Sequence, residues 1–361
     1  MSEHPQHHFP WRVTALVVAI VILATVIAGV ILTRNSVEEV SSPPSASASA
    51  SQGPSPLPLD ERRQLTLLLQ VHDKGSGIAS SVLIAAAGNT GFVSELLLPR
   101  DLLLPTSPPV RIKDTNGPRG PVSAQDPLQV LLGVQVDAAI DLDRLAWAGL
   151  IDAGGALADP DKGESASAFP LVLDRVLKGL PQDESAIGQL LTSLGSMAPT
   201  SVTNEDASHL LHLIAEGLRQ RPVKRAVLPV TYVRGGSRPV AVMRAAEAEP
   251  ILADLFPKAM LQTGHPGSPR VVLERSGASL GQVGQARESI VQAGMGVVIG
   301  ATVGSGGRSV VYIPEESPAA RRLGVDAAAA LGLPETAVLV DSGANPVVDL
   351  RITLGSDYAP V

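Results

Sequence analysis

A run of twenty residues without a charged side chain, residues 13–32, constrains this chain more than any other feature of its sequence. At about 1.5 Å per residue, a helix over this run is about 30 Å long, which matches the hydrocarbon thickness of a bilayer. A buried core helix seldom stays uncharged over that length, and the apolar part of a cleavable signal peptide is shorter, about 7–15 residues. We therefore predict an uncleaved transmembrane helix over residues 13–32, preceded by a cytoplasmic tail over residues 1–12.

The orientation of this predicted helix is only weakly specified by charge, because Arg12 and Arg34 flank it on both sides. A short tail before one span and a long region after it favours an extracytoplasmic position for the long region. The chain has no Cys, which is compatible with export and excludes a disulfide scaffold, a thiolate metal site and a Cys nucleophile. We expect a single-pass protein of the cell membrane with its soluble domains outside the cytoplasm.

The acidic charge balance excludes one large class of partners. The chain carries 28 Lys and Arg against 35 Asp and Glu, for a net charge of −7. A nucleic-acid partner needs a basic face, and the sequence also has no helix-turn-helix pattern. We therefore expect no nucleic-acid partner and no role as a DNA-binding regulator.

Composition divides the rest of the chain into two modules. Residues 33–59 form a linker that includes SSPPSASASASQGPSPLP at 41–58, and such a segment cannot bury enough apolar surface to offset its ordering entropy. A second Gly/Pro-rich linker, TGHPGSP, covers residues 263–269. The predicted domains are therefore residues 60–262 and residues 270–361.

The first module shows the pattern of an α/β domain with a mixed sheet. Short apolar runs with turn residues between them predict a strand meander, and helical periodicity follows it. The predicted strands are residues 65–71, 79–87, 92–98, 138–141 and 226–233, with an edge position for the last because of Pro229. The predicted helices are residues 126–132, with a cap at Ser123, and 142–151, 169–180, 185–194 and 204–218.

The second module alternates strands and helices in a compact order. The predicted strands are residues 271–274, 296–303, 309–313 and 348–354, with an extended segment at 337–340, and the predicted helices are residues 280–293 and 318–331. The order β-α-β-β-α-β favours a smaller, ferredoxin-like domain.

Several stretches of both modules resemble a known family. The first module carries LPRD at 98–101 and AAIDLDRLAWAGLIDAGGAL at 138–157, and the second carries RSVVYIP at 308–314 and ITLGSDY at 352–358. With these residues the first module resembles the LytR-CpsA-Psr domain, and the second resembles the LytR C-terminal domain. Catalytic members of that family transfer a polyprenyl-pyrophosphate-linked glycopolymer to peptidoglycan outside the cell. The resemblance implies that chemistry, or binding of its intermediates, for this chain.

The resemblance also shows which catalytic groups the chain lacks. A pyrophosphate substrate requires several Arg side chains and a carboxylate-held divalent metal. On our alignment Leu65 takes the place of a family Asp, and Leu173, Ala186 and Gln189 take the places of family Arg residues. The residual ligand-binding candidates are Arg63, Arg100, Asp101 and Arg175. We therefore predict a degenerate domain without catalytic residues, metal or cofactor, and we lean towards no enzymatic activity.

These observations leave two functional hypotheses. The first is a binding or scaffolding factor in cell-wall glycopolymer assembly or envelope integrity, with a polyprenyl-linked glycan, peptidoglycan or an active family relative as partner. The alternative is a glycopolymer-to-peptidoglycan phosphotransferase whose rearranged site recruits Arg111, Lys113 and Arg119. His209 and His212, three residues apart on a predicted helix, resemble a metal pair, but no third ligand is placed beside them.

Overall fold

The structure, a computed structural model, describes residues 64–72, 78–88, 90–115, 123–153, 169–235, 238–261, 265–304, 306–341 and 345–360. Among these residues, no helix has both the length and the apolar character needed to cross a membrane. The predicted tail, transmembrane helix and first linker lie outside the described residues, so they stay predictions. The described residues belong to one compact unit, Gly53–Val361.

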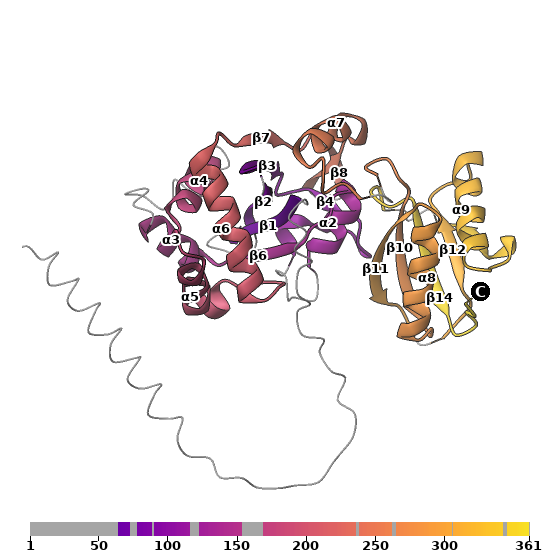
Figure 1. The fold of residues 1–361 in the computed structure, drawn as a ribbon. Helices are drawn as coiled ribbons and strands as arrows, with labels where there is room; N and C mark the ends of the chain where they lie inside the picture. The colour runs from indigo at the N-terminus through magenta and orange to yellow at the C-terminus, as the bar shows by residue number, and fades with distance from the viewer. Residues whose placement is uncertain are drawn as a thin grey trace, which may run out of the picture. The chain divides into compact units, whose positions relative to one another are not determined.

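A five-stranded mixed sheet forms the centre of the first module (Figure 1). Its strand order is β6-β1-β2-β3-β7. The strands β1, β2 and β3 form the predicted antiparallel meander, while β6 is parallel to β1 and β7 is parallel to β3. The bounds are β1 (Gln64–His72), β2 (Ile78–Ala87), β3 (Phe92–Leu98), β6 (Ala138–Leu142) and β7 (Lys224–Val227). Four strands therefore run the same way, and their carboxyl ends meet at one edge of the sheet, which we call the carboxyl edge.

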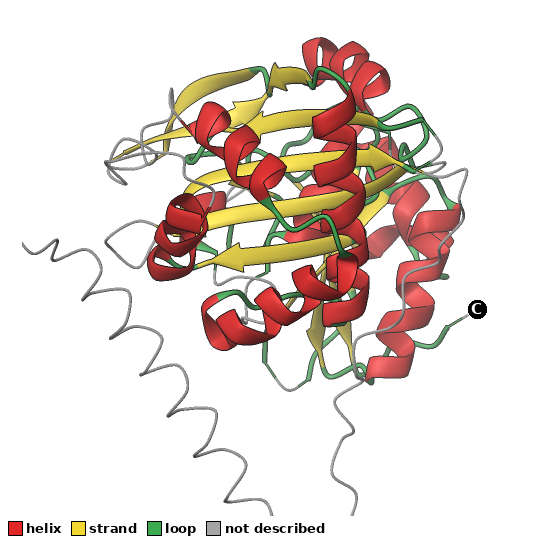
Figure 2. Ribbon diagram, turned by 60° about the vertical axis from the view of Figure 1, so that its left-hand side comes forward, coloured by secondary structure: helices red, strands yellow, loops and turns green. Residues whose placement is uncertain are grey.

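Helices cover both faces of this sheet, and Figure 2 shows those of one face lying across the strands. One face packs against α3 (Arg144–Ala153), α4 (Phe169–Gly179), α5 (Glu184–Leu194) and α6 (Asn204–Gln220), and the other packs against α2 (Gln125–Leu132) and α7 (Ala245–Leu255). Because side chains alternate along a strand, Leu67 and Leu69 of β1 enter the first core and Leu68 enters the second. This double burial explains the continuous apolar run in β1.

Side-chain caps set the starts of α5 and α6. Asp183 accepts a hydrogen bond from the Ser185 backbone N–H, and Thr203 accepts one from the Asp206 backbone N–H. The start of α2 differs from the prediction, since its N-cap is Ala124 and no side chain caps it. Ser123 lies one residue earlier and accepts a hydrogen bond from Gln125 N–H.

The predicted strand over residues 226–233 is wrong, because the segment forms two strands that belong to different sheets. After β7, the chain breaks at Leu228-Pro229, where Pro has no N–H to donate, and continues as β8 (Val230–Gly235). There β8 pairs only with β9 (Arg238–Met243). This hairpin and α7 were not predicted, and neither were β4 (Leu103–Leu104) and β5 (Val110–Arg111).

The second module contains the predicted elements in a different topology. Its sheet order is β11-β10-β14-β12-β13. The bounds are β10 (Arg270–Ser276), α8 (Leu280–Gln292), β11 (Gly296–Thr302), β12 (Val310–Ile313), α9 (Pro318–Ala330), β13 (Val338–Val340) and β14 (Leu350–Gly355). The ferredoxin-like prediction is wrong: that fold places another strand between the two joined by the first helix, whereas β10 and β11 are adjacent and parallel. Element order is encoded locally, but strand neighbours are not.

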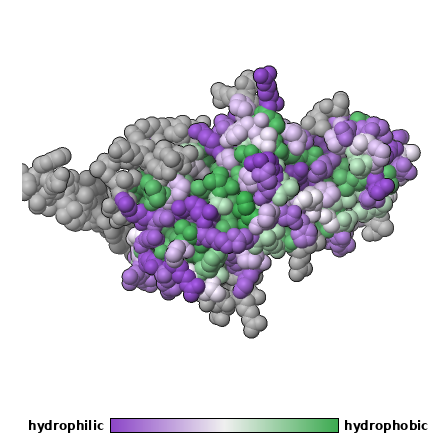
Figure 3. Space-filling model, turned by 90° about the horizontal axis from the view of Figure 1, so that it is seen from above, coloured by the Kyte–Doolittle hydropathy of each residue, from purple (hydrophilic) through white to green (hydrophobic). Residues whose placement is uncertain are grey.

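The exposed hydrophobic side chains of the described residues do not gather on one element. They include Val227 and Tyr232 near the β8–β9 hairpin, Leu145 on α3, Leu171 on α4 and Leu280 on α8. Figure 3 shows one face of the molecule, on which hydrophobic patches are separated by hydrophilic side chains. Isolated exposed side chains of this kind are common on folded proteins and do not by themselves mark a site.

Candidate functional site

A cavity without any polar lining residue other than the indole of Trp147 lies between the first sheet and its α3–α6 helices. Its volume is about 30 Å³. Its walls come from β1, β6, the four helices and the turn after α4. The lining residues are Leu69, Ile140, Leu142, Trp147, Leu150, Leu173, Val176, Leu177, Leu180, Ile187, Leu190, Leu191, Leu194 and Leu211. We call this space the helix-face cavity.

The sequence places these side chains together through strand register and helical spacing. Leu69 of β1 and Ile140 of β6 are direct neighbours in the parallel pairing, so they share one face of the sheet. On α4 and just beyond it, Leu173, Val176, Leu177 and Leu180 follow one another at helical spacing, which aligns them in one stripe. Leu150, Leu190 and Leu194 are only partly buried and form the part of the wall nearest to solvent.

Trp147 is the one residue of this wall with a polar atom in its side chain. It is 2% exposed, and its ring lies 5.7 Å from the ring of Phe169, centroid to centroid. The indole Nε1 is buried and has no hydrogen-bond partner among the described residues. A buried indole N–H usually finds a partner, so this donor is an exception that needs a cause.

The carboxyl edge of the sheet carries polar side chains that do not line the cavity. His72 ends β1, and its Nε2 lies 2.8 Å from the carboxylate of Asp141 on β6. The hydrogen bond to Asp141 raises the pKa of His72, with burial opposing it and the charges of Asp141 and Asp143 adding to it. One step into the sheet, Gln70 donates to Ser81 Oγ at 3.4 Å. This edge therefore holds a paired acid and base.

The basic residues that a rearranged transferase site would recruit are paired with local carboxylates. Lys113 Nζ lies 2.5 Å from Asp101, and Arg111 lies 2.5 Å from Asp114. Arg100, the remaining basic candidate at this edge, is exposed. Arg119 lies outside the described residues. The described part of this edge therefore has little unpaired positive charge with which to bind an anion.

Of the sequence-predicted site residues, Arg100, Asp101 and Arg175 lie in the described part of the chain. Arg63 lies outside the described residues, but Gln64 beside it begins β1 and aligns with Ala87 and Phe92, at the end opposite the carboxyl edge. Arg100 and Asp101 follow the carboxyl end of β3. Gln64 and Arg100 are therefore separated by the length of the sheet.

The remaining predicted positions lie on or near the helical face. Arg175 is exposed on α4 and Leu65 is 4% exposed in the first core. Leu173 lines the helix-face cavity, whereas Ala186 and Gln189 lie on α5. Leu65 and Leu173 thus serve as core or cavity wall.

Sequence reasoning missed a buried cluster of charged side chains on the sheet face that α3, α4, α5 and α6 cover. Glu95 in β3 is fully buried, and Arg225 of β7 lies 2.6 Å from it and 2.5 Å from Asp174 of α4. Burial raises the pKa of Glu95 to about 7, against the opposing charge of Arg225. One signal was available in the sequence, because Glu95 is the only charged residue in the strand FVSELLL.

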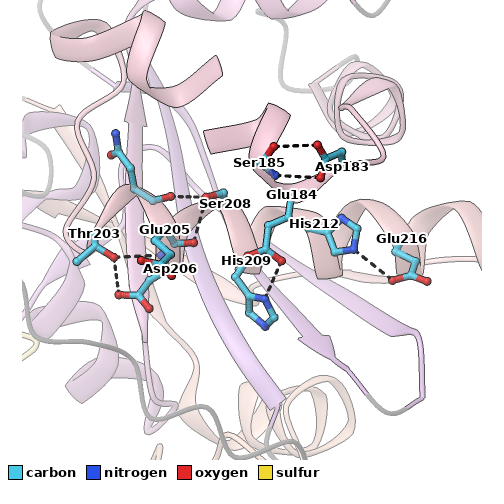
Figure 4. Close-up of polar contacts among 11 residues, drawn as sticks. Asp183, Glu184, Ser185, Thr203, Glu205, Asp206, Ser208, His209, His212 and Glu216 are labelled. Atoms are coloured by element: carbon cyan, nitrogen blue, oxygen red, sulfur yellow. Dashed lines mark hydrogen bonds and ion pairs between the residues drawn. The ribbon is translucent and has the colours of Figure 1, made fainter. Parts of the chain in front are cut away.

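His209 and His212 bind different glutamates, as Figure 4 shows. His209 Nδ1 lies 3.0 Å from Glu184 of α5, and His212 Nε2 lies 3.7 Å from Glu216 on its own helix. In the part of the chain that the structure describes, no group of three or more His, Asp or Glu side chains is arranged to hold a metal ion. The His209–Glu184 contact joins α6 to α5, whereas the His212–Glu216 contact lies within α6.

Comparison of the sequence with known protein families gives no match, and comparison with curated proteins gives none either. Comparison with solved structures finds distant similarities over a little more than half of the chain. TagT of B. subtilis is 10% identical with a TM-score of 0.44, covering 59% of this chain and 99% of TagT. A structure of TagT bound to LI-WTA is 12% identical with a TM-score of 0.46 and the same coverage. Protein gbs0355 from Streptococcus agalactiae is 14% identical with a TM-score of 0.45, covering 55% of this chain and 89% of that protein.

Proposed function

We propose that this chain binds a lipid-linked intermediate of cell-wall glycopolymer assembly and acts as a binding or scaffolding factor. The observation that carries the proposal is the helix-face cavity, whose walls are almost entirely hydrocarbon. Such a wall suits the apolar tail of a polyprenyl lipid, since the free energy of its burial depends on area and not on charge. The resemblance to the LytR-CpsA-Psr family supplies the class of lipid.

The pairing of charges supports binding without transfer. Displacing a pyrophosphate needs cations or a metal that stabilise the charge developing on the leaving group, and losing one such donor costs about 2.7–4 kcal/mol. Lys113 and Arg111 are already paired with Asp101 and Asp114. Their recruitment to a substrate would leave these carboxylates without their partners.

The size of the cavity implies that the walls move when a tail enters. The present volume is about 30 Å³, whereas an engineered apolar cavity that binds benzene measures about 150 Å³. A tail would enter at the partly buried wall residues Leu150 and Leu190. Tail binding therefore requires the cavity to widen.

A binding assay with matched variants tests the proposal. Purified full-length chain in detergent is titrated with a polyprenyl phosphate, with Mg²⁺ or with chelator. We expect binding that the chelator hardly changes and that Leu190→Trp weakens, because the larger ring occupies the entrance. Leu145→Trp on α3 is the control, since Leu145 is 71% exposed and outside the cavity. Equal binding by both variants would contradict the proposal.

A turnover assay separates the proposal from the transferase alternative. We expect no Mg²⁺- or Mn²⁺-dependent pyrophosphatase or glycopolymer transfer above a protein-free blank. Metal-dependent turnover that disappears in Arg100→Ala would establish the phosphotransferase with a rearranged site in its place.

We also propose that residues 13–32 anchor the chain, with the soluble part outside the cytoplasm. The support is the uncharged run of membrane-spanning length followed by the Pro/Ser/Ala-rich linker. Protease added to intact spheroplasts should digest residues 60–361 and leave a small membrane-held fragment. Complete protection of the soluble part would reverse the orientation.

A further inference from the structure

We propose that a cleft between the two modules binds a neutral sugar ring. The cleft lies between residues 106–109, in the turn from β4 to β5, and the sheet of the second module. Its volume is about 250 Å³, and its wall exposes polar as well as apolar surface. We call this space the inter-module cleft. It shares no residue with the helix-face cavity, and it gives the second module a role that the proposed function does not.

The floor of the cleft is a row of three side chains on the second sheet. Val272 of β10 and Tyr312 of β12 both pair with Arg351 of β14, so the three residues are neighbours across the strands. Their sequence neighbours on both sides enter the core beneath α8 and α9. Because side chains alternate along a strand, the row lies on the opposite face of the sheet.

Arg351 is a donor that the protein already holds in place. Its guanidinium lies over the Tyr312 ring, 4.2 Å from the ring centroid. Its Nη1 donates to Glu274 at 3.2 Å, and its Nη2 donates to Asp341. The guanidinium has more N–H groups than these two bonds use, and the side chain is 35% exposed. Arg351 can therefore donate to a ligand without losing its present partners.

The cleft also offers an acceptor and a hydroxyl. Asp349 uses its Oδ2 to accept hydrogen bonds from the backbone N–H and the Nε of Arg270, at 2.8 Å and 3.3 Å. The other oxygen of Asp349 and the Tyr312 hydroxyl have no hydrogen-bond partner within the described residues. A hydroxyl both donates and accepts. The cleft thus suits a ligand that carries donors and acceptors together.

The charges around the cleft favour a neutral ligand. The carboxylates of Glu274, Asp341 and Asp349 outnumber the guanidinium groups of Arg270 and Arg351. A phosphate or a carboxylate would approach these acids, whereas a cation would approach Arg351 in the floor, and like charges in contact are unfavourable. A ligand whose polar groups are hydroxyls avoids both conflicts.

The size and the apolar surface of the cleft favour a ring. An engineered cavity that holds benzene measures about 150 Å³, so the inter-module cleft has room for a six-membered ring with substituents. Val272, Val348 and Pro109 supply apolar surface for the C–H faces of such a ring. The hydroxyls at the perimeter of a pyranose can then reach Arg351 and Asp349.

An extended peptide suits the cleft less well. A peptide that adds to a sheet needs unpaired backbone groups along the rim. The N–H groups of Asp341, Val348 and Asp349 already donate to backbone oxygens of the second module. Recognition at this rim therefore depends on side chains, which suits the scattered hydroxyls of a sugar.

Calorimetric titration of the full-length chain with free sugars tests the inference. Glucose and galactose are the neutral probes, and glucuronate and galacturonate are the same rings with a carboxylate. In at least one pair the neutral sugar should bind, and its acid should bind about tenfold more weakly because the carboxylate meets Asp341 and Asp349. Absence of binding by both neutral sugars, or equal binding by a sugar and its acid, would overturn the inference.

Two variants with matched controls locate the binding. Tyr312→Phe keeps the ring under Arg351 and removes one hydroxyl, so binding should weaken by about two- to tenfold. Tyr232→Phe is its control, since Tyr232 is 60% exposed on β8. Val348→Trp should abolish binding by filling the cleft, whereas Leu280→Trp, at a position 75% exposed on α8, should not.

The same titrations keep this inference separate from the proposed function. Full sugar binding by Tyr312→Phe, or by Val348→Trp shown to be folded by thermal unfolding, would place the sugar elsewhere and overturn the inference. Leu190→Trp should weaken polyprenyl phosphate binding and leave sugar binding unchanged. Polyprenyl binding without sugar binding overturns only the inter-module site, and sugar binding without polyprenyl binding overturns only the proposed function.

Discussion

At the scale of single residues, the most consequential group is the buried carboxylate of Glu95. It is fully buried, one of its oxygens has no hydrogen-bond partner among the described residues, and Arg225 neutralises the other. Arg225 is shared with Asp174, so one guanidinium serves two carboxylates. Removing one partner of a buried ion pair is costly because the charge left behind has no compensation.

We predict that Arg225→Met lowers the free energy of unfolding by about 3–5 kcal/mol at pH 8. The loss should be smaller at pH 5: the pKa of Glu95 is raised to about 7, so the carboxyl takes up a proton and no buried charge remains. Urea denaturation at the two pH values measures the difference. Lys224→Met on the same strand is the control, since its pair with Asp254 is exposed and contributes at most about 1 kcal/mol. A loss for Arg225→Met that is independent of pH would contradict this account.

The raised pKa of His72 predicts a pH dependence of its own. Folding favours the protonated imidazole beside Asp141, so this stabilisation is complete below the ordinary His pKa of about 6.5 and is lost as pH rises through the folded value. His72→Gln should therefore lower the urea midpoint more at pH 5.5 than at pH 8.5. The wild type and the variant are compared at both pH values, and an equal shift at both would show that the imidazole charge has no role.

At the scale of elements, two helical glycines in the second module have opposite surroundings. A Cβ on Gly324 of α9 would lie 2.7 Å from Ile313 and 2.8 Å from Val338, on the strands that α9 packs against. A Cβ on Gly284 of α8 would meet nothing within 4 Å. Glycine at 324 therefore sets how closely α9 approaches its sheet, whereas glycine at 284 only weakens the helix.

We predict that Gly284→Ala stabilises the chain by up to about 1 kcal/mol through helix propensity. Gly324→Ala should destabilise it, because overpacking costs about 1–3 kcal/mol and exceeds that gain. Thermal unfolding of both variants, with amide exchange in α8 and α9, measures the two effects. A stabilising Gly324→Ala would mean that α9 moves away from β12 and β13 at little cost.

At the scale of the whole molecule, the two modules contact each other through a few polar groups and through a small apolar cluster of Leu103, Val240 and Val347. Ser107, in the turn between β4 and β5, donates to Glu274 of β10, and Asn345 donates to the backbone oxygen of Thr106 at 3.0 Å. Glu274 is also paired with Arg351 and accepts from Thr353, both within the second module. The buried charge of Glu274 thus keeps partners even without the first module.

We predict that a fragment of residues 268–361 folds alone with a cooperative transition. Its α8 and α9 cover one face of the sheet around their own core, and Glu274 remains paired with Arg351. Circular dichroism and amide exchange of the purified fragment check this. An unfolded fragment would show that the two modules share a core.

The sequence by itself determined most of the elements of this protein, because apolar period, caps and Gly/Pro breaks are local. The helix predicted over residues 204–218 is α6, and the meander predicted over residues 65–98 is β1 to β3. The prediction of one strand over residues 226–233 failed because no local signal indicates whether the chain continues in the same sheet after Pro229.

Only the tertiary structure decided which distant residues meet. The parallel pairing of β10 with β11 replaced the ferredoxin-like order, and strand direction placed Gln64 and Arg100 at opposite ends of one sheet. The tertiary arrangement also formed the helix-face cavity. It paired Glu95 with Arg225, which lies 130 residues away in the sequence. Hydrophobic burial is non-directional, so the sequence indicates which side chains are buried but not which residues they contact. Strand register and helix packing determine those contacts.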